Sequence, residues 1–179
     1  DVVKYAADLG HYVADACVPL HTTYNYNGQY TNQDGIHALW ESKIPELVND
    51  YDYYIGKAVY LDRPLRFSWS LVRESFELVD TTLTLEKNLS KTYLEDNKYM
   101  PFSKNFEMTQ QYSLEYILDY NDMLNGMVEK RMERAVFATA SFWYSAWVDA
   151  GQPDLMKLKN VDVTDKLKKK TNNYTKENA

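Results

Sequence analysis

The chain has 179 residues, of which 45% are hydrophobic, and a net charge of −6 when the histidines are neutral. This composition excludes an intrinsically disordered protein, and the length suits one domain with a sizeable core. Residues 1–156 carry −10 and residues 157–179 carry +4, so the body is acidic and unsuited to tight, sequence-independent nucleic-acid binding. A nuclease whose metal ions meet the phosphate is still compatible with this charge. No stretch reaches the ~18 apolar residues of a membrane span.

Residues 2–17 are expected to form a helix that ends before Pro19. Small or apolar residues recur along it at helical spacing and would let another helix approach closely: Val3, Ala6, Ala7, Gly10, Ala14 and Cys17. Cys17 is the single cysteine, so it has no internal disulfide partner. On an apolar helix face it is most simply a small core residue.

Residues 22–33 are expected to form a polar loop, with a turn signal at Asn27-Gly28. Its three tyrosines are candidate substrate-binding residues that could stack on a base or line a lipid-headgroup pocket: Tyr24, Tyr26 and Tyr30. The other interpretation is that these rings pack over the ends of helices.

The next segment contains two helix starts. Asp34 is expected to cap a helix that carries His37 and Glu41. Pro45 is expected to open a further helix that ends near Gly56.

The rest of the chain also has helical periodicity. Apolar residues from Trp69 to Leu83 recur at spacings of three and four and predict one amphipathic helix, extended as far as Tyr93. Residues 95–107 are expected to form a connecting loop. Residues 109–150 are helical again, with a kink or break near Asn125-Gly126. Strand-like alternation is scarce, so the sequence predicts an all-α helical bundle.

All three histidines of the chain lie in one stretch, and two of them have a carboxylate four residues later: His11-x3-Asp15 and His37-x3-Glu41. Residues i and i+4 share one face of a helix, with Cβ atoms about 5–6 Å apart, so each pair could chelate a metal ion. His21 follows the first pair. Two imidazoles and a carboxylate with an open fourth position are a known ligand set of catalytic zinc. A single such pair is more often a surface ion pair or a core histidine, but two pairs and a third histidine together favour a metal site.

The order His-x3-Asp, Pro-Leu-His and His-x3-Glu resembles the superfamily of zinc-dependent phospholipases C and single-strand-specific zinc nucleases. The stretches AADLGHYVADACVPLH and SFWYSAWVDAGQPDL resemble bacterial proteins of the phospholipase C family. The resemblance covers most of the chain up to about residue 155 and implies an all-α fold with three zinc ions (Zn2+). It implies that His11 and Asp15 are ligands of a closely spaced zinc pair, with Asp15 bridging. The ligands that it implies for the third zinc are His21, His37 and Glu41.

In that superfamily the zinc pair also uses an N-terminal Trp, a nearby His, and a further Asp and His, all of which precede the His-x3-Asp helix. This chain has no residues there, so we expect it to be the C-terminal portion of a longer protein. Residues 1–155 would belong to one all-α domain whose missing N-terminal half is a partner, and residues 156–179 would form a basic, flexible tail. The resemblance also implies a periplasmic or secreted location, although the chain has no signal peptide.

The expected function is zinc-dependent hydrolysis of a phosphodiester, in which a metal-activated water attacks phosphorus. The substrate is either a phospholipid or a single-stranded nucleic acid. Glu41 is the form typical of phospholipases C, whereas Trp40 and the Ile44-Pro45 that follows resemble the nucleases. An alternative from another class is a non-catalytic helical interaction module that retains a residual metal site.

Overall fold

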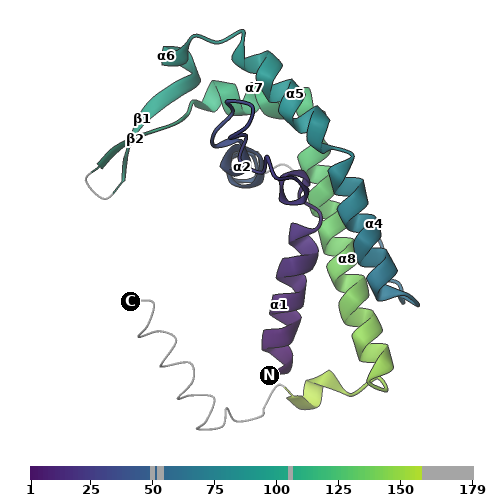
Figure 1. The fold of residues 1–179 in the computed structure, drawn as a ribbon. Helices are drawn as coiled ribbons and strands as arrows, with labels where there is room; N and C mark the ends of the chain where they lie inside the picture. The colour runs from purple at the N-terminus through teal and green to yellow at the C-terminus, as the bar shows by residue number, and fades with distance from the viewer. Residues whose placement is uncertain (49–50, 52–54, 105–106, 159–179) are drawn as a thin grey trace. The chain divides into compact units, whose positions relative to one another are not determined.

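The computed structural model describes residues 1–48, 51, 55–104 and 107–158 (Figure 1). Within 102–109 it describes the backbone of residues 102–104 and 107–109 only. Most of the described residues are helical, and their strands form a single short hairpin, which confirms the all-α prediction. The chain divides into two compact units, Asp1–Ser145 and Ala146–Ala179. The features described below belong to the first unit unless stated.

The elements follow one another along the chain with these bounds: α1 Val2–Asp15, η1 Pro19–Thr22, α2 Ile36–Ala38, η2 Leu39–Lys43, α3 Ile44–Leu47, α4 Pro64–Phe76, α5 Val79–Ser90, α6 Glu95–Lys98, β1 Tyr99–Lys104, β2 Glu107–Tyr112, α7 Leu114–Leu124, α8 Met127–Asp149 and η3 Leu155–Leu158. Helix α8 begins in the first unit and ends in the second, which also contains η3. Of the basic tail expected at 156–179, residues 159–179 lie outside the described residues.

Helix α1 forms as predicted and packs closely against α8 in the first unit. A Cβ added at Gly10 would lie 3.2 Å from the Trp143 ring, so the glycine permits a tight approach of the two helices. The Trp143 indole donates a hydrogen bond of 2.9 Å to the carbonyl of Ala6. Cys17 is only 1% exposed and lies in a core cluster with Val13, which confirms its prediction as a core residue.

The single long helix predicted from Trp69 onward is wrong, because the chain breaks into α4 and α5 at residues 77–78. The two helices pack in different core clusters. Leu71 of α4 packs with residues of α1 and α8, whereas Leu89 of α5 packs with the residues around the histidines. No proline or glycine marks this break in the sequence; the separate clusters account for it.

Residues 95–107, predicted to be a loop, instead contain α6, strand β1 and the start of β2. The strands are antiparallel, and their register pairs Tyr99 with Tyr112 and Met100 with Gln111. The rings of Tyr99 and Tyr112 lie 5.1 Å apart, and Tyr112 in turn stacks on Tyr116 of α7. Aromatic contacts therefore join the hairpin to α7, and the pairing of Tyr99 with Tyr112 across the two strands is not revealed by helical periodicity.

Two further predicted helix boundaries have opposite outcomes. The break at Asn125-Gly126 is confirmed: both residues adopt positive φ, 49° and 75°, between α7 and α8. The helix predicted from Pro45 to near Gly56 is wrong, because α3 ends at Leu47 and Val48 has an extended backbone. Residues 49–50 and 52–54 of that prediction lie outside the described residues.

Candidate metal centre

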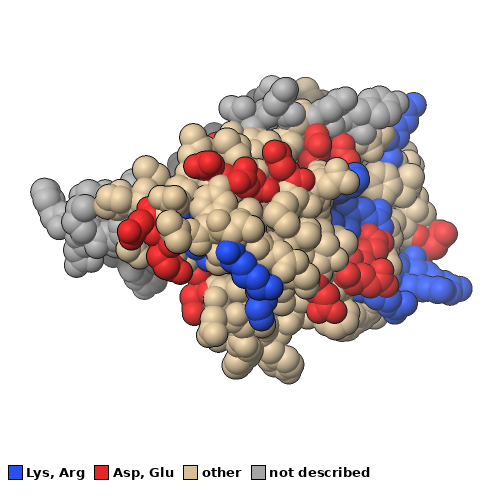
Figure 2. All heavy atoms as spheres, turned by 90° about the horizontal axis from the view of Figure 1, so that it is seen from above, with Lys and Arg blue, Asp and Glu red and all other residues tan. Residues whose placement is uncertain are grey.

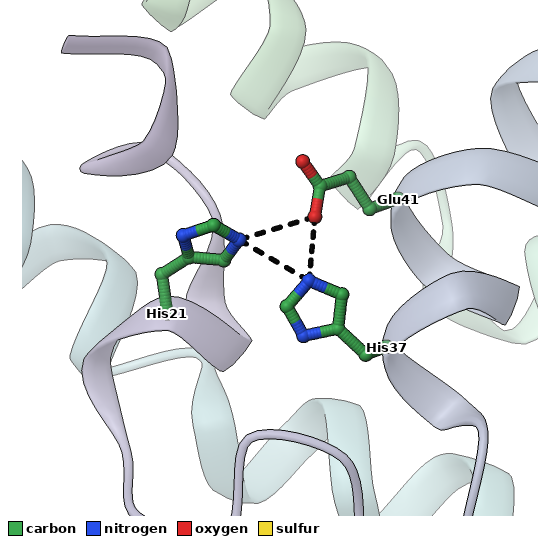
Figure 3. Close-up of side chains that lie close together, drawn as sticks. All are labelled: His21, His37 and Glu41. Carbon is green, nitrogen blue, oxygen red and sulfur yellow. Dashed lines mark hydrogen bonds and ion pairs between the residues drawn. The ribbon is translucent and has the colours of Figure 1, made fainter. Parts of the chain in front are cut away.

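Three of the predicted ligands converge at one point (Figure 3). His21 comes from η1, His37 from α2 and Glu41 from η2. The two histidine Nε2 atoms are 3.2 Å apart, and they lie 3.1 Å and 2.7 Å from the same carboxylate oxygen, Glu41 Oε2. Among the described residues, this is the one cluster of three or more histidine, cysteine or carboxylate side chains able to share an ion.

The triangle formed by these atoms has the dimensions that zinc requires. With sides of 2.7, 3.1 and 3.2 Å, a point about 1 Å outside its plane lies about 2.0 Å from all three atoms, which matches Zn–N and Zn–O bond lengths. An ion placed there would leave one side of its coordination sphere open. The donor set is two imidazoles and one carboxylate, so the residues present fit a catalytic zinc ion.

Buried neighbours hold the two histidines in place. Pro19 opens η1, where its fixed φ suits the first helical position, and Leu20 beside His21 is fully buried. On the other side, Ile36 and Leu39 flank His37 and are also fully buried. The apolar residues enter the core, and the ligands between them face the common point.

His37 and Glu41 are in contact although they lie in helices of different types, α2 and the π-helical turn η2. We predicted one helix capped by Asp34; this cap is wrong, because Gly35 holds the N-cap position with φ of 93°. After α2 the backbone widens into η2, a single π-helical turn that contains Glu41. Such turns occur frequently at functional sites.

Groups behind the histidines orient the imidazole rings. Nδ1 of His37 lies 3.2 Å from the carbonyl oxygen of Tyr26, and this oxygen can accept only if Nδ1 carries the proton. That tautomer leaves the Nε2 lone pair directed at the centre. Asp15 Oδ2 lies 3.8 Å from Nδ1 of His21, on the side away from the centre, where a carboxylate would favour the same tautomer.

The other predicted metal ligands do not join the three-residue cluster. His11 Nε2 lies 3.4 Å from Asp15 Oδ2, so the i, i+4 pair on α1 forms. The His11 side chain is 70% exposed, whereas the Asp15 carboxylate is mostly buried and lies between His11 and His21. The structure thus brings Asp15 next to the centre and leaves His11 at the surface.

The three candidate substrate-binding tyrosines are exposed: Tyr24 by 93%, Tyr26 by 55% and Tyr30 by 76%. Tyr26 meets His37 edge-on, with the ring centroids 6.2 Å apart. Packing over helix ends therefore does not describe Tyr24 and Tyr30, whereas Tyr26 contacts His37 of the short helix α2. Their role in binding substrate is still a prediction.

A buried polar network fixes the loop that joins His21 to His37. The Gln33 side-chain amide donates to the carbonyl of Leu83, at 2.7 Å, and to the Glu86 carboxylate of α5. Glu86 is fully buried, and its other oxygen accepts from Lys98, at 3.1 Å, and from the Tyr116 hydroxyl, at 2.6 Å. Burial, and then the hydrogen bond to Glu86, raise the pKa of Tyr116, so this hydroxyl stays a donor.

The positive end of this network is enclosed by aromatic rings. The Lys98 ammonium lies 5.1–5.7 Å from the ring centres of Tyr99, Tyr112 and Tyr116. At this distance cation–π attraction adds to the ion pair. Sequence analysis missed the network, because Gln33, Glu86 and Lys98 are far apart along the chain and nothing local marks them as partners.

Gly28→Ala is expected to weaken both the fold and zinc binding. Gly28 has φ of 78°, and an added Cβ would overlap the backbone carbonyl of Gln33. The left-handed backbone alone should lower the free energy of unfolding by about 1–2 kcal/mol, and the overlap lowers it further. The overlap also displaces the loop that spaces His21 and His37, so the Kd for zinc should rise.

The matched control is Gly126→Ala, which has a similar φ of 75° but open space around the added Cβ. Urea unfolding and a zinc titration measure the two effects. An equal loss of stability in both variants, with zinc affinity unchanged in Gly28→Ala, would contradict the role given to the loop.

Comparison with protein-family models, with curated proteins and with solved structures gave no match for this chain. Over the ranges that the structure describes, each helix is too short or too polar to cross a bilayer. The site is therefore interpreted from its own geometry and chemistry.

Proposed function

We propose that this chain provides a zinc centre, built by His21, His37 and Glu41, to a phosphodiester hydrolase. The observation that carries the proposal is the convergence of two imidazole nitrogens and one carboxylate oxygen within 3.2 Å of one another. A bound zinc ion with an open position would polarise a phosphoryl oxygen and lower the pKa of its water, which suits ester hydrolysis near neutral pH.

The residues of the chain have distinct tasks in this proposal. The two histidines would offer the lone pairs of their Nε2 atoms to the ion, and Glu41 would offset part of its charge. The carbonyl of Tyr26 keeps His37 in the tautomer that leaves Nε2 free. The hydrogen bond from Gln33 to Glu86, here called the Gln33 anchor, holds the loop between His21 and His37. The spacing of the two imidazoles therefore does not depend on the substrate.

His11 and Asp15 are proposed as half of a second zinc position, with Asp15 as the bridging carboxylate. Two ligands do not hold zinc tightly unless further groups complete the coordination shell. The resemblance to the phospholipase C and nuclease superfamily supplies those groups from a segment that precedes the His-x3-Asp helix. A segment that supplies these groups is thus the proposed partner, and export to the periplasm or medium is the proposed location.

A phospholipid is the substrate that we propose first, and a single-stranded nucleic acid is second. Glu41 at the last ligand position favours the phospholipase C type. On the face shown in Figure 2, the acidic and basic side chains of the described residues are intermixed, and these residues form no broad basic surface. Such a face offers little phosphate neutralisation along a nucleic-acid strand, so recognition would depend on the metal centre.

The second candidate function is a helical interaction module that retains the metal site without catalysis. The observation that favours it is the apolar surface of α1, whose side chains are 67–82% exposed at Val2, Val3, Tyr5 and Tyr12. Exposed apolar residues gathered on one element often mark a binding surface for another protein.

An activity assay on the full-length protein separates the two functions. Loaded with zinc, it is expected to hydrolyse at least one of phosphatidylcholine, single-stranded DNA, RNA and bis(p-nitrophenyl) phosphate, and a chelator should abolish the activity. Preference for lipid would support the inference from Glu41, and preference for nucleic acid the inference from Trp40. If the zinc-loaded protein turns over none of these, the hydrolase proposal fails and the interaction module replaces it.

A further inference from the structure

Helix α4 carries apolar residues on two nearly opposite faces, and the described residues cover only one of them. On the first face, Leu71 is fully buried in the core cluster that also contains Val13 of α1 and Phe142 of α8. The second face is formed by four residues at spacings of three and four: Leu65, Trp69, Val72 and Phe76. A surface helix normally has a single apolar stripe, which faces the core, so the second stripe indicates a binding partner.

The second face of α4 is open to solvent. Leu65 is 72% exposed, Trp69 61% and Phe76 58%, and Val72 is partly exposed. The helix lies at the edge of the bundle in Figure 1, and all of these residues belong to the first unit of the chain. Large apolar side chains gathered on one exposed face mark a binding surface, whereas single ones scattered over a protein do not.

The charges of α4 make the second face basic. Arg66 and Arg73 lie beside it on the helix surface, two turns apart, and Arg63 precedes the first turn. Over the ranges that the structure describes, none of these three guanidinium groups has an ion-pair partner. The one carboxylate within α4, Glu74, points to the other side, where it pairs with two arginines of α8 at 2.8 and 3.4 Å.

We propose that the second face of α4 binds the surface of a membrane that contains anionic phospholipids. Leucine, tryptophan and phenylalanine beside arginine are typical of helices that lie in the plane of a bilayer, with their apolar side chains at the boundary of headgroups and acyl chains. The indole of Trp69 suits this depth, because its body is apolar and its N–H is polar. Arg66 and Arg73 would pair with lipid phosphates. With 13 residues, α4 is too short to cross a bilayer and would lie along it.

A membrane fits the second face better than a second copy of the chain does. In a symmetric dimer the same surface of both copies meets, so the arginines of one copy would face those of the other without a carboxylate of α4 to pair them. Lipid phosphates supply that negative charge. Asp62 and Glu77 flank α4 and the body of the chain is acidic, so the attraction is local and is screened beyond about 10 Å at moderate ionic strength. Binding should therefore be reversible and should weaken as salt is raised.

Sedimentation with vesicles tests this surface without requiring catalysis. The full-length protein is kept free of zinc by a chelator, so that no hydrolysis alters the lipid. It is mixed at low salt with vesicles of phosphatidylcholine alone or of phosphatidylcholine and phosphatidylserine. We expect it to sediment with the mixed vesicles, less with phosphatidylcholine alone, and to be released by sodium chloride. Absence of binding to the mixed vesicles at low salt overturns the proposal.

Substitutions on the second face locate the contact. Trp69→Gln/Phe76→Gln is expected to weaken binding to the mixed vesicles at least about 10-fold, because two apolar side chains no longer leave water. Arg66→Gln/Arg73→Gln should weaken it about 25-fold, about 5-fold for each arginine, and remove the preference for phosphatidylserine. All four side chains are exposed, so Tm should not change, and the single variant Leu65→Gln replaces a double variant that does not fold. Folded variants that bind as the wild type does overturn the assignment to α4.

Matched variants on other helices provide the controls. Tyr5→Gln/Tyr12→Gln removes two rings of α1 that are 67% and 71% exposed, on a helix whose exposed surface includes Asp8. Lys87→Gln/Lys91→Gln removes two exposed cations of α5. Both variants should bind the mixed vesicles as the wild type does. A loss in them equal to that of the α4 variants overturns the assignment to the second face.

The same measurements separate this surface from the other possible partner and from the proposed function. If the protein ignores vesicles but forms a dimer in the ultracentrifuge that Trp69→Gln/Phe76→Gln dissociates, the face is an interface between copies and the membrane proposal fails. A protein that binds vesicles but, when loaded with zinc, hydrolyses no phosphodiester keeps the membrane surface and loses the proposed function. Hydrolysis of bis(p-nitrophenyl) phosphate without vesicle binding has the opposite meaning.

Discussion

Replacing His37 with alanine is expected to weaken zinc binding by more than about 100-fold. Loss of a group that only supports a ligand typically lowers metal affinity 10–100-fold, and His37 is itself a ligand, so the loss should exceed that range. The substitution removes one of three donors and leaves Ile36 and Leu39 in the core, so the apo protein should keep its helical content. Isothermal titration with zinc and circular dichroism measure the two quantities separately.

His11→Ala is the matched control for this prediction. His11 is 70% exposed and lies outside the three-residue cluster, so this variant should retain the tight zinc site. The wild-type chain is accordingly expected to hold one zinc tightly, with any ion at His11 and Asp15 bound weakly. Three tightly bound ions per chain would contradict the inference that the site at His11 and Asp15 is incomplete. An equal loss of zinc affinity in His37→Ala and His11→Ala would contradict the assignment of His37 as a zinc ligand.

Glu86→Leu is expected to lower the free energy of unfolding by about 3–5 kcal/mol. Glu86 is fully buried and Lys98 is 5% exposed, so the substitution leaves a buried ammonium without its carboxylate and Tyr116 without its acceptor. Denaturant unfolding of the apo protein measures the loss. The Kd for zinc should also rise, because Gln33 loses one of its two hydrogen bonds to α5.

Two further variants test the origin of this loss. The double variant Glu86→Leu/Lys98→Met should recover part of the stability, because it removes the unpaired charge along with its partner. Glu46→Leu breaks the exposed ion pair with Lys43 and should change stability by less than about 1 kcal/mol. If the double variant is as unstable as Glu86→Leu, the unpaired charge is not the cause.

The parts of the structure that were predictable are those encoded by nearby residues. The spacing of His37 and Glu41 predicts their contact, and the small residues of α1 predict the close approach of another helix, which the structure identifies as α8 at Gly10. The Asn125-Gly126 pair predicts the break between α7 and α8, since both residues tolerate positive φ. In each case the physical cause lies within a few residues.

The parts that were missed depend on contacts between distant segments. The hairpin is fixed by Tyr99, Tyr112 and Tyr116, and α4 separates from α5 because each helix packs in a different core cluster. The link between Gln33 and Glu86 joins residues 53 positions apart. Periodicity is read in windows much shorter than this, so these features emerge only once the chain is folded.

The Gln33 anchor also affects the order in which folding and metal capture occur. His21 and His37 are separated by 16 residues, and closing such a loop loses conformational entropy whatever closes it. In zinc-finger peptides the metal itself supplies the free energy for this ordering, and the apo state is unfolded. Here Gln33 holds the loop on α5 through two hydrogen bonds, so the two imidazoles would already be aligned when a zinc ion binds at the proposed centre. The proposed centre would therefore lose and regain zinc without local refolding.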